Sequence, residues 1–451
     1  MNVSEVVAEA QRQDLRLVRF EYCDVSGVAR TKAIHVGQLP HKLVEGVSLT
    51  RAQMAIDLLE QLVDIEGMAP VGEIRLVPDP DTFTVLPWAP GSASVLCDQV
   101  GHDRRDWGAC PRSFLKRVVE RAAGLGVHVQ ATFENEYYLA RHVDGRYVPF
   151  DHPDHTPVYS AIGHDLNARV MIDTVDALHA QGIAVEQAIN EYGPGQQEIS
   201  IRHTDALGAA DNQMKFRDTV RGVALGHGLF ASFAPKPYPE AIGSGAHVHL
   251  SLWDDDGRSS LYDPAAEGGL SKLGRSFIAG VTTHLPALVA LTTPSYNSFR
   301  RLVPSAWASA TTGWGFDNKE VALRVCSPFY KREEQSYNLE FKPSDPSANP
   351  YLALGALIAC GLDGIERELE PGEPCGQDPA RMSAAELARS QVRPLPTSMG
   401  AALDELEKDS ILLDSMGELL ARCYLGVRRS EEQAFAGQDE EFELRNHFYR
   451  F

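Results

Sequence analysis

One segment constrains this chain more than any other: residues 236–251, with the sequence Lys-Pro-Tyr-Pro-Glu-Ala-Ile-Gly-Ser-Gly-Ala-His-Val-His-Leu-Ser. Its second half alternates polar and apolar residues, with His247, His249 and Ser251 at every second position. Such alternation predicts a β-strand, in which residues two apart point to the same side. The preceding Gly243-Ser-Gly245 predicts a turn whose bare backbone a ligand can approach closely. We therefore expect this strand to present two imidazoles and a hydroxyl to a binding site.

Acidic residues occur in comparable patterns elsewhere in the chain. Some stand two positions apart, where a strand places them on one face, and two flank Tyr-Gly-Pro-Gly-Gln-Gln, a turn that can fold both toward one site. Carboxylates with a single imidazole suit Mg²⁺ or Mn²⁺ better than zinc, and a set of this size could hold two or more ions. Metal ions at such sites commonly neutralise phosphate charge during phosphoryl transfer. The candidate ligands are Glu134, Glu136, Glu191, Glu198, His247 and Glu340.

Basic residues that could hold carboxylate or phosphate oxygens accompany the acidic set. Lys342 follows Glu340 at a spacing of two, so a strand would place both on one face. The other candidates are Arg300, Arg301, Lys319 and Arg324. Metal-binding acids and phosphate-binding bases in one chain predict an active site rather than a scaffold.

The overall composition limits the classes of function. The chain of 451 residues carries 42 basic and 62 acidic residues, a formal net charge of −20. This excess of acid argues against a nucleic-acid or anionic-membrane surface, which needs a basic patch. The seven cysteines lack CxxC spacing, and no apolar run approaches the ~18 residues of a membrane span. We expect a cytoplasmic protein that binds small molecules, with neither nucleic acid nor a membrane as partner.

Two units follow from the pattern of expected elements. Residues 1–105 are rich in short strands and turns, whereas residues 106–451 mix helices with strands, which predicts an α+β fold. Residues 368–396 and 151–155 are interpreted as surface loops. The expected helices are 114–123, 167–181, 206–227, 273–291, 350–367 and 398–416. The expected strands are two within 15–36, then 73–77, 82–86, 93–97, 127–133, 198–202, 245–252, 320–325 and 338–341.

The order of the motifs resembles the glutamine synthetase family. The shared motifs are Glu134-x-Glu136, Glu191-Tyr-Gly-Pro-Gly-Gln-Gln-Glu198, Lys236-Pro-x5-Gly-Ser-Gly-x-His-x-His-x-Ser, Asn297-Ser-Phe-Arg-Arg-Leu-Val-Pro304, Asn349-Pro-Tyr-Leu-Ala and Gly361-Leu-Asp-Gly364. The resemblance covers nearly the whole chain, at a length like that of type I members. It implies an N-terminal β-grasp-like domain and a catalytic domain whose curved antiparallel sheet is flanked by helices. It also implies a double-ring dodecamer, with each active site between the catalytic domain of one subunit and the N-terminal domain of the next.

The resemblance implies a role for each matched residue. The metal near the amino-acid substrate would be held by Glu136, Glu191 and Glu198. The metal beside the nucleotide phosphates would be held by Glu134, His247 and Glu340. Glutamate would be bound by the Gly243 backbone and Arg301. The ATP site would include Lys236, His249, Ser251 and Arg324. The catalytic basic residues would be Arg301, Lys319, Arg324 and Lys342.

Some positions depart from the family pattern, and they bear on the substrate. Trp307 stands where an acidic flap residue is usual, and Thr50 aligns with an aspartate that completes the ammonium site. Both changes remove negative charge from the pocket for NH₄⁺, and a tryptophan offers an apolar wall or a cation–π face instead. Ile242 replaces a usual asparagine and puts glutamate itself in question. Lys319 and Lys342 replace arginines, which keeps the charge but loses the bidentate fork.

These features predict an ATP-dependent ligase that joins glutamate to a small primary amine through a γ-glutamyl phosphate. Mg²⁺ or Mn²⁺ would be the metal and ATP the co-substrate. Two alternatives stay open: a true glutamine synthetase that uses ammonium, and a catalytically silent assembly protein of the same fold. The full set of metal ligands argues against the silent protein.

Overall fold

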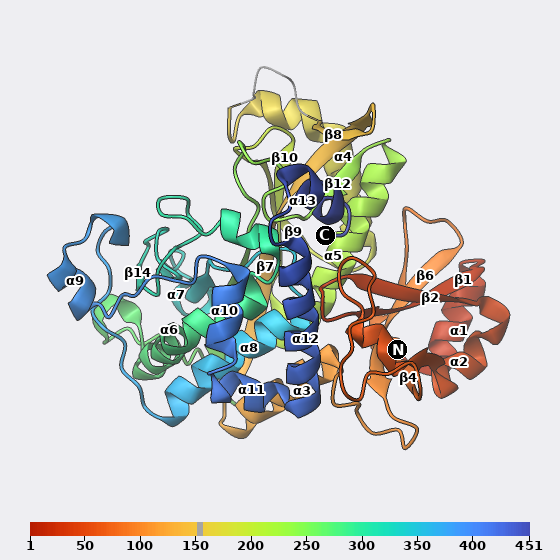
Figure 1. Ribbon diagram of the computed structural model, residues 1–451, viewed down its shortest axis with the longest axis horizontal. Coiled ribbons are helices and arrows are strands. Elements are labelled where there is room, and N and C mark those ends of the chain that lie inside the picture. The colour runs from red at the N-terminus through yellow and green to blue at the C-terminus, as the bar shows by residue number, and fades with distance from the viewer. Residues whose placement is uncertain (151–156) are drawn as a thin grey trace.

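The computed structural model describes residues 1–150 and 157–451 and contains two sheets, one in each part of the chain (Figure 1). The N-terminal unit lies at the right of Figure 1 in red and orange, and the larger unit fills the rest. This arrangement confirms the predicted α+β fold, in which helices flank a largely antiparallel second sheet. The cluster Asp151 to His155, which we interpreted as a surface loop, lies outside the described residues.

The N-terminal unit is built on a six-stranded sheet. Its first two strands form the predicted antiparallel hairpin, and the first also runs parallel to the last. Two helices that the sequence did not predict, α1 (Val3–Arg12) and α2 (Leu39–Glu45), pack their apolar side chains into its core. The strands are β1 (Leu17–Cys23), β2 (Ala29–His35), β3 (Val47–Thr50), β4 (Glu73–Pro78), β5 (Thr84–Val85) and β6 (Ser92–Val100), in the spatial order β2-β1-β6-β4-β3 with β5 on β6.

A connecting segment joins the two units. Strand β6 ends at Val100 and helix α3 (Pro111–Gly124) begins at Pro111, so the boundary that we expect between residues 105 and 106 falls between these elements. Proline favours the first position of a helix because its fixed φ suits the helix and its missing N–H would have no partner there.

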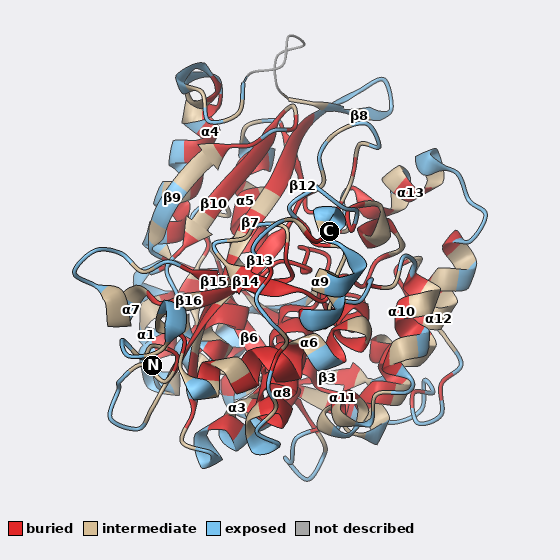
Figure 2. Ribbon diagram, turned by 90° about the vertical axis from the view of Figure 1, so that its left-hand side faces the viewer, coloured by how far each residue is buried: buried red, intermediate tan, exposed pale blue. Residues whose placement is uncertain are grey.

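The second sheet has ten strands and occupies the centre of the larger unit, where Figure 2 shows mostly buried ribbon. Its path runs β14-β15-β16-β13-β7-β10-β9, while β8, β11 and β12 pair with β7 off this path. The strands are β7 (His128–Val143), β8 (Arg146–Pro149), β9 (Val185–Asn190), β10 (Gln196–Ile201), β11 (Thr204–Asp205), β12 (Phe230–Ser232), β13 (Ala246–Trp253), β14 (Trp314–Phe316), β15 (Leu323–Cys326) and β16 (Asn338–Phe341).

The long strand β7 shows why the sheet has one functional face. Val129, Ala131 and Phe133 are buried in the core, while the residues between them, up to Glu134 and Glu136, are less buried. Burying each large apolar side chain contributes about 1.5–3 kcal/mol. A slip of one residue would exchange the two faces, so the apolar positions fix which side the carboxylates occupy.

Helices cover the sheet, and most of those predicted are present with slightly shifted ends. One prediction was wrong: residues 398–416 form two helices, because the side chain of Asp409 accepts a hydrogen bond from the Leu412 N–H and caps a new helix. The segment 368–396 also contains a short helix, which begins after the capping box of Ser383 and Glu386. The helices are α4 (Ala161–Ala180), α5 (Ala206–Gly226), α6 (Lys272–Thr292), α7 (Glu333–Ser336), α8 (Pro350–Glu366), α9 (Ala384–Arg389), α10 (Met399–Leu406) and α11 (Ser410–Met416).

The C-terminal segment packs back onto the larger unit. Helices α12 (Glu418–Phe435) and α13 (Glu440–His447), which the sequence did not predict, are the blue helices that end near the top of Figure 1. Phe448 and Phe451 are fully buried, and the carbonyl oxygen of Phe451 accepts a hydrogen bond of 2.8 Å from the Phe233 N–H, just after β12. The end of the chain is therefore part of the core beside the second sheet.

Two sequence-level expectations concern the whole chain. All seven cysteines are buried and free, as the absence of a disulfide pattern predicted. Across residues 1–150 and 157–451, no helix combines the length and apolarity that a membrane crossing requires.

A buried histidine gives a stability prediction. His284 on α6 lies between two carboxylates, with Nδ1 2.6 Å from Asp409 and Nε2 3.0 Å from Asp363, which Arg367 also contacts. Burial disfavours the imidazolium, but the two carboxylates outweigh it and raise the pKa of His284 above its usual 6.5. The ion pairs therefore contribute fully below about pH 6.5 and are lost as the pH rises through the folded-state pKa.

We expect His284→Gln, which cannot ionise, to lower the free energy of unfolding at pH 6 by about 1.5–3 kcal/mol, the range for hydrogen bonds to charged groups. The difference from the unmodified protein should shrink at alkaline pH. Denaturant unfolding at several pH values measures it, and a difference that does not change with pH would contradict the charged state of His284.

Candidate active site

Cross-strand pairs on the second sheet bring the predicted ligands together. His247 on β13 is opposite Glu134 on β7, and Glu136 is opposite Glu198 on β10. His249 is opposite Glu340, which is opposite Arg324 on β15 in turn. Directly opposite residues have Cβ atoms about 4.5–5.5 Å apart. The register of five strands thus gathers residues from 134 to 340 into one patch.

Two cavities adjoin this patch. The larger, of about 470 Å³, is lined by His249, Ser251 and Arg324 together with the loop that carries Phe329. The smaller, of about 240 Å³, contains the acidic cluster and the acid-binding candidates. The residues common to both linings are Glu134, Gln187 and Arg324. The two cavities therefore meet at the metal-binding patch, where groups bound on either side could react.

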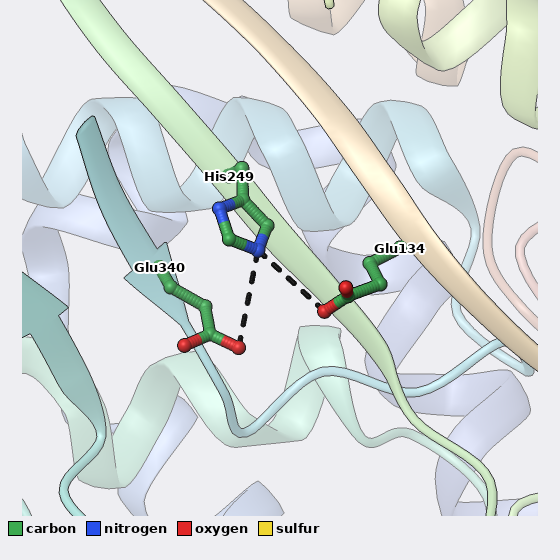
Figure 3. A group of neighbouring side chains, drawn as sticks. All are labelled: Glu134, His249 and Glu340. Carbon is green, nitrogen blue, oxygen red and sulfur yellow. Dashed lines mark ion pairs between the residues drawn. The ribbon is translucent and has the colours of Figure 1, made fainter. Parts of the chain in front are cut away.

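The phosphate-side metal candidates form a compact group in which both histidines take part. Figure 3 shows His249 between Glu134 and Glu340, 3.6 Å from the first carboxylate and 3.9 Å from the second. One ligand atom from each of these residues lies within 4.8 Å of the others. The Nδ1 of His247 is also 3.3 Å from Glu134 and 3.3 Å from Glu340. The structure thus places the His249 imidazole beside Glu134, His247 and Glu340, the three residues expected to hold this metal.

The two imidazoles differ in charge, which separates their roles. Burial and the nearby Lys342 lower the pKa of His247 to about 4, so its ring is neutral and can donate a lone pair to a metal. Although burial opposes it, hydrogen bonds to Cys326 and Glu134 raise the pKa of His249 well above 6.5. His249 is therefore a cation among carboxylates, and His247 remains the better candidate ligand.

The remaining carboxylates form the second part of the cluster. Burial and the neighbouring carboxylates raise the pKa of Glu198 to about 10, and burial raises that of Glu136 to about 7. Burial also raises the pKa of Glu191. Glu136 accepts hydrogen bonds from the Gly245 N–H at 2.9 Å and from Gln196 at 3.3 Å. Clustered acids that hold protons mark a place where a divalent cation would fit, because its charge would stabilise their ionised forms.

The acid-binding candidate Arg301 lies at the inner wall of the smaller cavity. Its Nη2 lies 3.1 Å from His247 Nε2 and donates to the Lys342 carbonyl at 3.2 Å, while the buried Nη1 has no hydrogen-bond partner among residues 1–150 and 157–451. A buried guanidinium nitrogen without a partner is costly unless a ligand satisfies it. Gly243 packs against Arg301, where an added Cβ would come within 2.9 Å of its side chain. This contact explains why the turn requires glycine.

The other basic candidates surround the same patch. Lys342 is 3.0 Å from Glu340 Oε1, and Arg324 Nε is 2.8 Å from Glu340 Oε2. Although burial opposes ionisation, these charges and the histidines lower the pKa of Glu340 to about 2. Lys319 lines the smaller cavity, where its ammonium lies 4.9 Å from the centre of the Trp307 ring. Of these three cations, Arg324 lines both cavities, whereas Lys319 and Lys342 line the smaller one only.

Trp307, Tyr192 and Tyr159 form an aromatic corner of the smaller cavity, of which the sequence analysis predicted only Trp307. The ring of Trp307 is 41% exposed and meets Tyr192 edge to face at 5.8 Å, and Tyr192 meets Tyr159 at 6.4 Å. All three line the smaller cavity. Tyr192 directly follows Glu191, a position that could have drawn attention to it, but nothing local in the sequence marks Tyr159. Trp307 also has a φ of 55°, a left-handed conformation that is unusual for a bulky residue.

Two predicted residues, Lys236 and Thr50, do not lie in the cavity that their expected roles suggest, whereas Ile242 does. Lys236 lines the smaller cavity with Gly243, not the larger one with His249 and Ser251. Thr50 ends strand β3 in the N-terminal sheet and lines neither cavity. Ile242 lines the smaller cavity, as a residue that contacts the acid would.

Comparison with known proteins identifies the family. The family model for the glutamine synthetase catalytic domain matches residues 108–447, and that for the glutamine synthetase N-terminal domain matches residues 1–111. A gamma-glutamylpolyamine synthetase of Streptomyces coelicolor is 36% identical over 438 residues, covering 96% of this chain and 93% of its own. The glutamine synthetase of Halobacterium salinarum is 32% identical over 456 residues, covering 100% and 97%.

Similar solved structures point to the same family. A protein described as a novel glutamine synthase homolog has a TM-score of 0.86 at 32% identity, covering 97% of this chain and 99% of its own. A protein described as a GmaS complex with ADP has a TM-score of 0.85 at 28% identity, covering 98% of each chain. Together the two family models cover residues 1–447, and each of these relatives and structures covers at least 96% of the chain. The chain therefore belongs to the glutamine synthetase family, whose members are ATP-dependent carbon–nitrogen ligases that use divalent metals.

Proposed function

We propose that this protein joins the γ-carboxylate of glutamate to a small primary amine, with ATP as the energy source. The observation that supports an amine over ammonium is the aromatic corner of Trp307, Tyr192 and Tyr159 in the cavity that also contains Arg301. Apolar and aromatic surface stabilises a bound alkyl or aryl group, whereas ammonium has none to bury.

The two-step chemistry follows from the reactivity of a carboxylate, which is a poor electrophile. A γ-carboxylate oxygen attacks the terminal phosphorus of ATP, and ADP leaves. The amine, after losing its ammonium proton to solvent, attacks the acyl carbon with its lone pair; inorganic phosphate leaves as the C–N bond forms, and the nitrogen releases a second proton to give the amide. Mg²⁺ or Mn²⁺ at the carboxylate cluster would neutralise phosphate charge. Arg301 would hold the α-carboxylate of glutamate, while Arg324, Lys319 and Lys342 would stabilise the transferring phosphoryl group.

The charges around the aromatic corner favour an amine with one positive charge. The acidic residues lining the smaller cavity are the five carboxylates assigned to metals. Lys319 adds a positive charge beside Trp307, which would repel a second ammonium group on the substrate. A monoamine with an apolar substituent therefore fits this cavity better than a polyamine, although one relative is named as a polyamine ligase.

The function is tested by phosphate release from the purified protein with Mg²⁺, ATP and glutamate, across ammonium, butylamine and putrescine. Butylamine and putrescine have the same carbon chain and differ in the second amino group. We expect butylamine to exceed both others. Higher activity with ammonium would instead support a true glutamine synthetase, and higher activity with putrescine a polyamine ligase.

A silent assembly protein remains the alternative from another class. Such a protein would bind no nucleotide, so Mg·ATP would not change its melting temperature.

We propose that the active form is a cytoplasmic double-ring dodecamer in which Thr50 contributes to the site of a neighbouring subunit. The location of Thr50 outside both cavities of its own chain supports that assignment. Light scattering of the purified protein measures the assembly.

Removing the aromatic wall should change the choice of amine. We expect Trp307→Ala to lower kcat/KM for butylamine by about 10-fold, since burial of such a side chain is worth about 1.5–3 kcal/mol and each ~1.4 kcal/mol corresponds to tenfold. The KM for ATP should stay within about twofold. Trp307→Phe, which keeps an aromatic wall, is the matched control and should retain the amine ranking. An unchanged ranking in Trp307→Ala would show that this residue does not contact the amine.

A further inference from the structure

We propose that Glu443, on the C-terminal helix α13, is a positioning residue for the acid-binding end of the smaller cavity. It would act by holding Arg300, the neighbour of Arg301, and by fixing the segment that carries both arginines. The inference rests on the proposed function in that the acid is taken to be glutamate. It assigns a part in substrate binding to a helix about 140 residues away from that segment in the sequence.

Glu443 is buried, with a side chain only 3% exposed, and both its oxygens are used. Arg300 donates to them from Nε at 2.9 Å and from Nη2 at 2.7 Å, which is a bidentate pair. Asn297 donates a third hydrogen bond from Nδ2 at 3.1 Å. One carboxylate thus binds two residues of the segment that ends in Arg301, and charge-assisted pairs of this geometry are the stronger kind.

The same network reaches the glycine turn. The Oδ1 of Asn297 accepts a hydrogen bond of 2.6 Å from the Lys236 N–H, and the carbonyl of the preceding Pro235 accepts one of 2.7 Å from the Ser244 N–H. Lys236, Gly243 and Arg301 all line the smaller cavity. Glu443 is therefore connected, through Asn297, to both segments that form the acid-binding wall.

Aromatic contacts hold α13 against those segments from outside. Phe448 packs on Tyr238 with ring centres 6.0 Å apart, and on Tyr147 at 4.1 Å with nearly parallel rings. The carbonyl of Phe451 accepts its hydrogen bond from the Phe233 N–H, close to Lys236 in the chain. These contacts keep the helix in place when Glu443 is replaced, so the effect of its charge can be measured separately.

The charge matters because two arginines stand next to each other in the chain. Within the part of the chain that the structure describes, Arg301 keeps a buried Nη1 without a partner, whereas Arg300 lines the same cavity and is neutralised by Glu443. Without that carboxylate, the guanidinium of Arg300 would be free to compete with Arg301 for the substrate carboxylate in another geometry. Glu440 cannot replace it, because its side chain is 60% exposed and 3.7 Å from Arg300.

The test compares Glu443→Gln with Glu440→Gln in the full-length protein, using the best amine from the panel. We expect Glu443→Gln to raise the KM for glutamate about tenfold, the effect of losing one charge-assisted interaction of about 1.4 kcal/mol. The KM for ATP should stay within about twofold. Glu440→Gln, one turn away on the same helix, should leave both constants unchanged. Equal constants for both variants, or a parallel rise in both KM values for Glu443→Gln, would overturn the proposal.

A second variant separates positioning from a loss of folding. Arg300→Met removes the residue that makes the bidentate pair with Glu443, so adding Glu443→Gln to it should raise the KM for glutamate by clearly less than tenfold, with the remainder coming from the contact to Asn297. Strictly additive effects of the two substitutions would contradict the coupling. Melting temperatures show whether each variant is folded. If the unmodified protein itself releases no phosphate with glutamate, the proposed function fails, a result distinct from an active protein that is insensitive to Glu443→Gln.

Discussion

Replacing Glu340 with alanine is expected to lower kcat by at least about 10³-fold, because a bound metal contributes several kcal/mol of transition-state stabilisation and each ~1.4 kcal/mol is tenfold. Glu340 lies within 3.3 Å of His247 and faces Glu134 across the histidines. Its low pKa, about 2, keeps it ionised throughout the range of assay. Steady-state phosphate release at saturating Mg²⁺ and ATP measures the loss.

The same substitution has a structural consequence that must be controlled. Lys342 is buried and 3.0 Å from Glu340, so the alanine variant leaves a buried ammonium without its partner, which costs about 3–5 kcal/mol. Glu340→Gln preserves the side-chain volume and should be nearly as inactive while more stable. Glu386 on α9, which is only partly exposed and lines neither cavity, serves as the control, since Glu386→Ala should retain full activity. Near-normal turnover in folded Glu340→Ala would contradict the metal-ligand assignment.

Arg301→Lys is expected to lower kcat/KM for glutamate by about 10²-fold, while the KM for ATP stays within about twofold. Lysine keeps the positive charge but cannot present two parallel N–H donors to a carboxylate. The loss of a bidentate contact costs about 2–3 kcal/mol, and each ~1.4 kcal/mol is tenfold. The unpaired Nη1 of Arg301, buried in the smaller cavity, is the donor that this substitution removes.

Initial rates at varied glutamate and fixed ATP give the comparison, and calorimetric titration of glutamate gives the binding constant independently of turnover. Arg301 also contacts His247 at 3.1 Å, so its loss could disturb the metal site. An equal fall in the affinity of Arg301→Lys for Mg²⁺ would show that the lower kcat/KM results from weaker metal binding rather than from weaker glutamate binding. An unchanged kcat/KM for glutamate would show that another residue binds the acid.

Local sequence patterns were sufficient for the strands that carry the chemistry. The alternation in residues 128–137 and 246–252 fixes which side chains share a face, because a strand has a period of two residues. That rule alone paired Glu134 with Glu136 and His247 with His249. The turn between Glu191 and Glu198 also follows from its glycines and proline, and the structure shows the hairpin of β9 and β10 there.

The ends of helices and the contacts between distant segments were harder to predict from the sequence. The break between α10 and α11 depends on the cap at Asp409, a single hydrogen bond that competes with a continuous helical pattern. The second imidazole beside Glu340 depends on how β13 is paired with β16, which no spacing in the sequence reports. The sequence analysis did not single out Glu443, and only the packing of α13 shows that its carboxylate is buried against Arg300.

The sequence by itself therefore determined the family, the fold class and the faces of the functional strands, because periodicity and ordered motifs are local properties of the chain. Only the tertiary structure decided which strands lie side by side, which cavity each side chain lines, and which charges are neutralised. Tyr159 and Trp307 are 148 positions apart in the chain yet line one cavity. Burial and proximity arise from contacts between segments far apart in the chain, and these contacts set the charge of His249 and the exposure of Arg301 to a ligand.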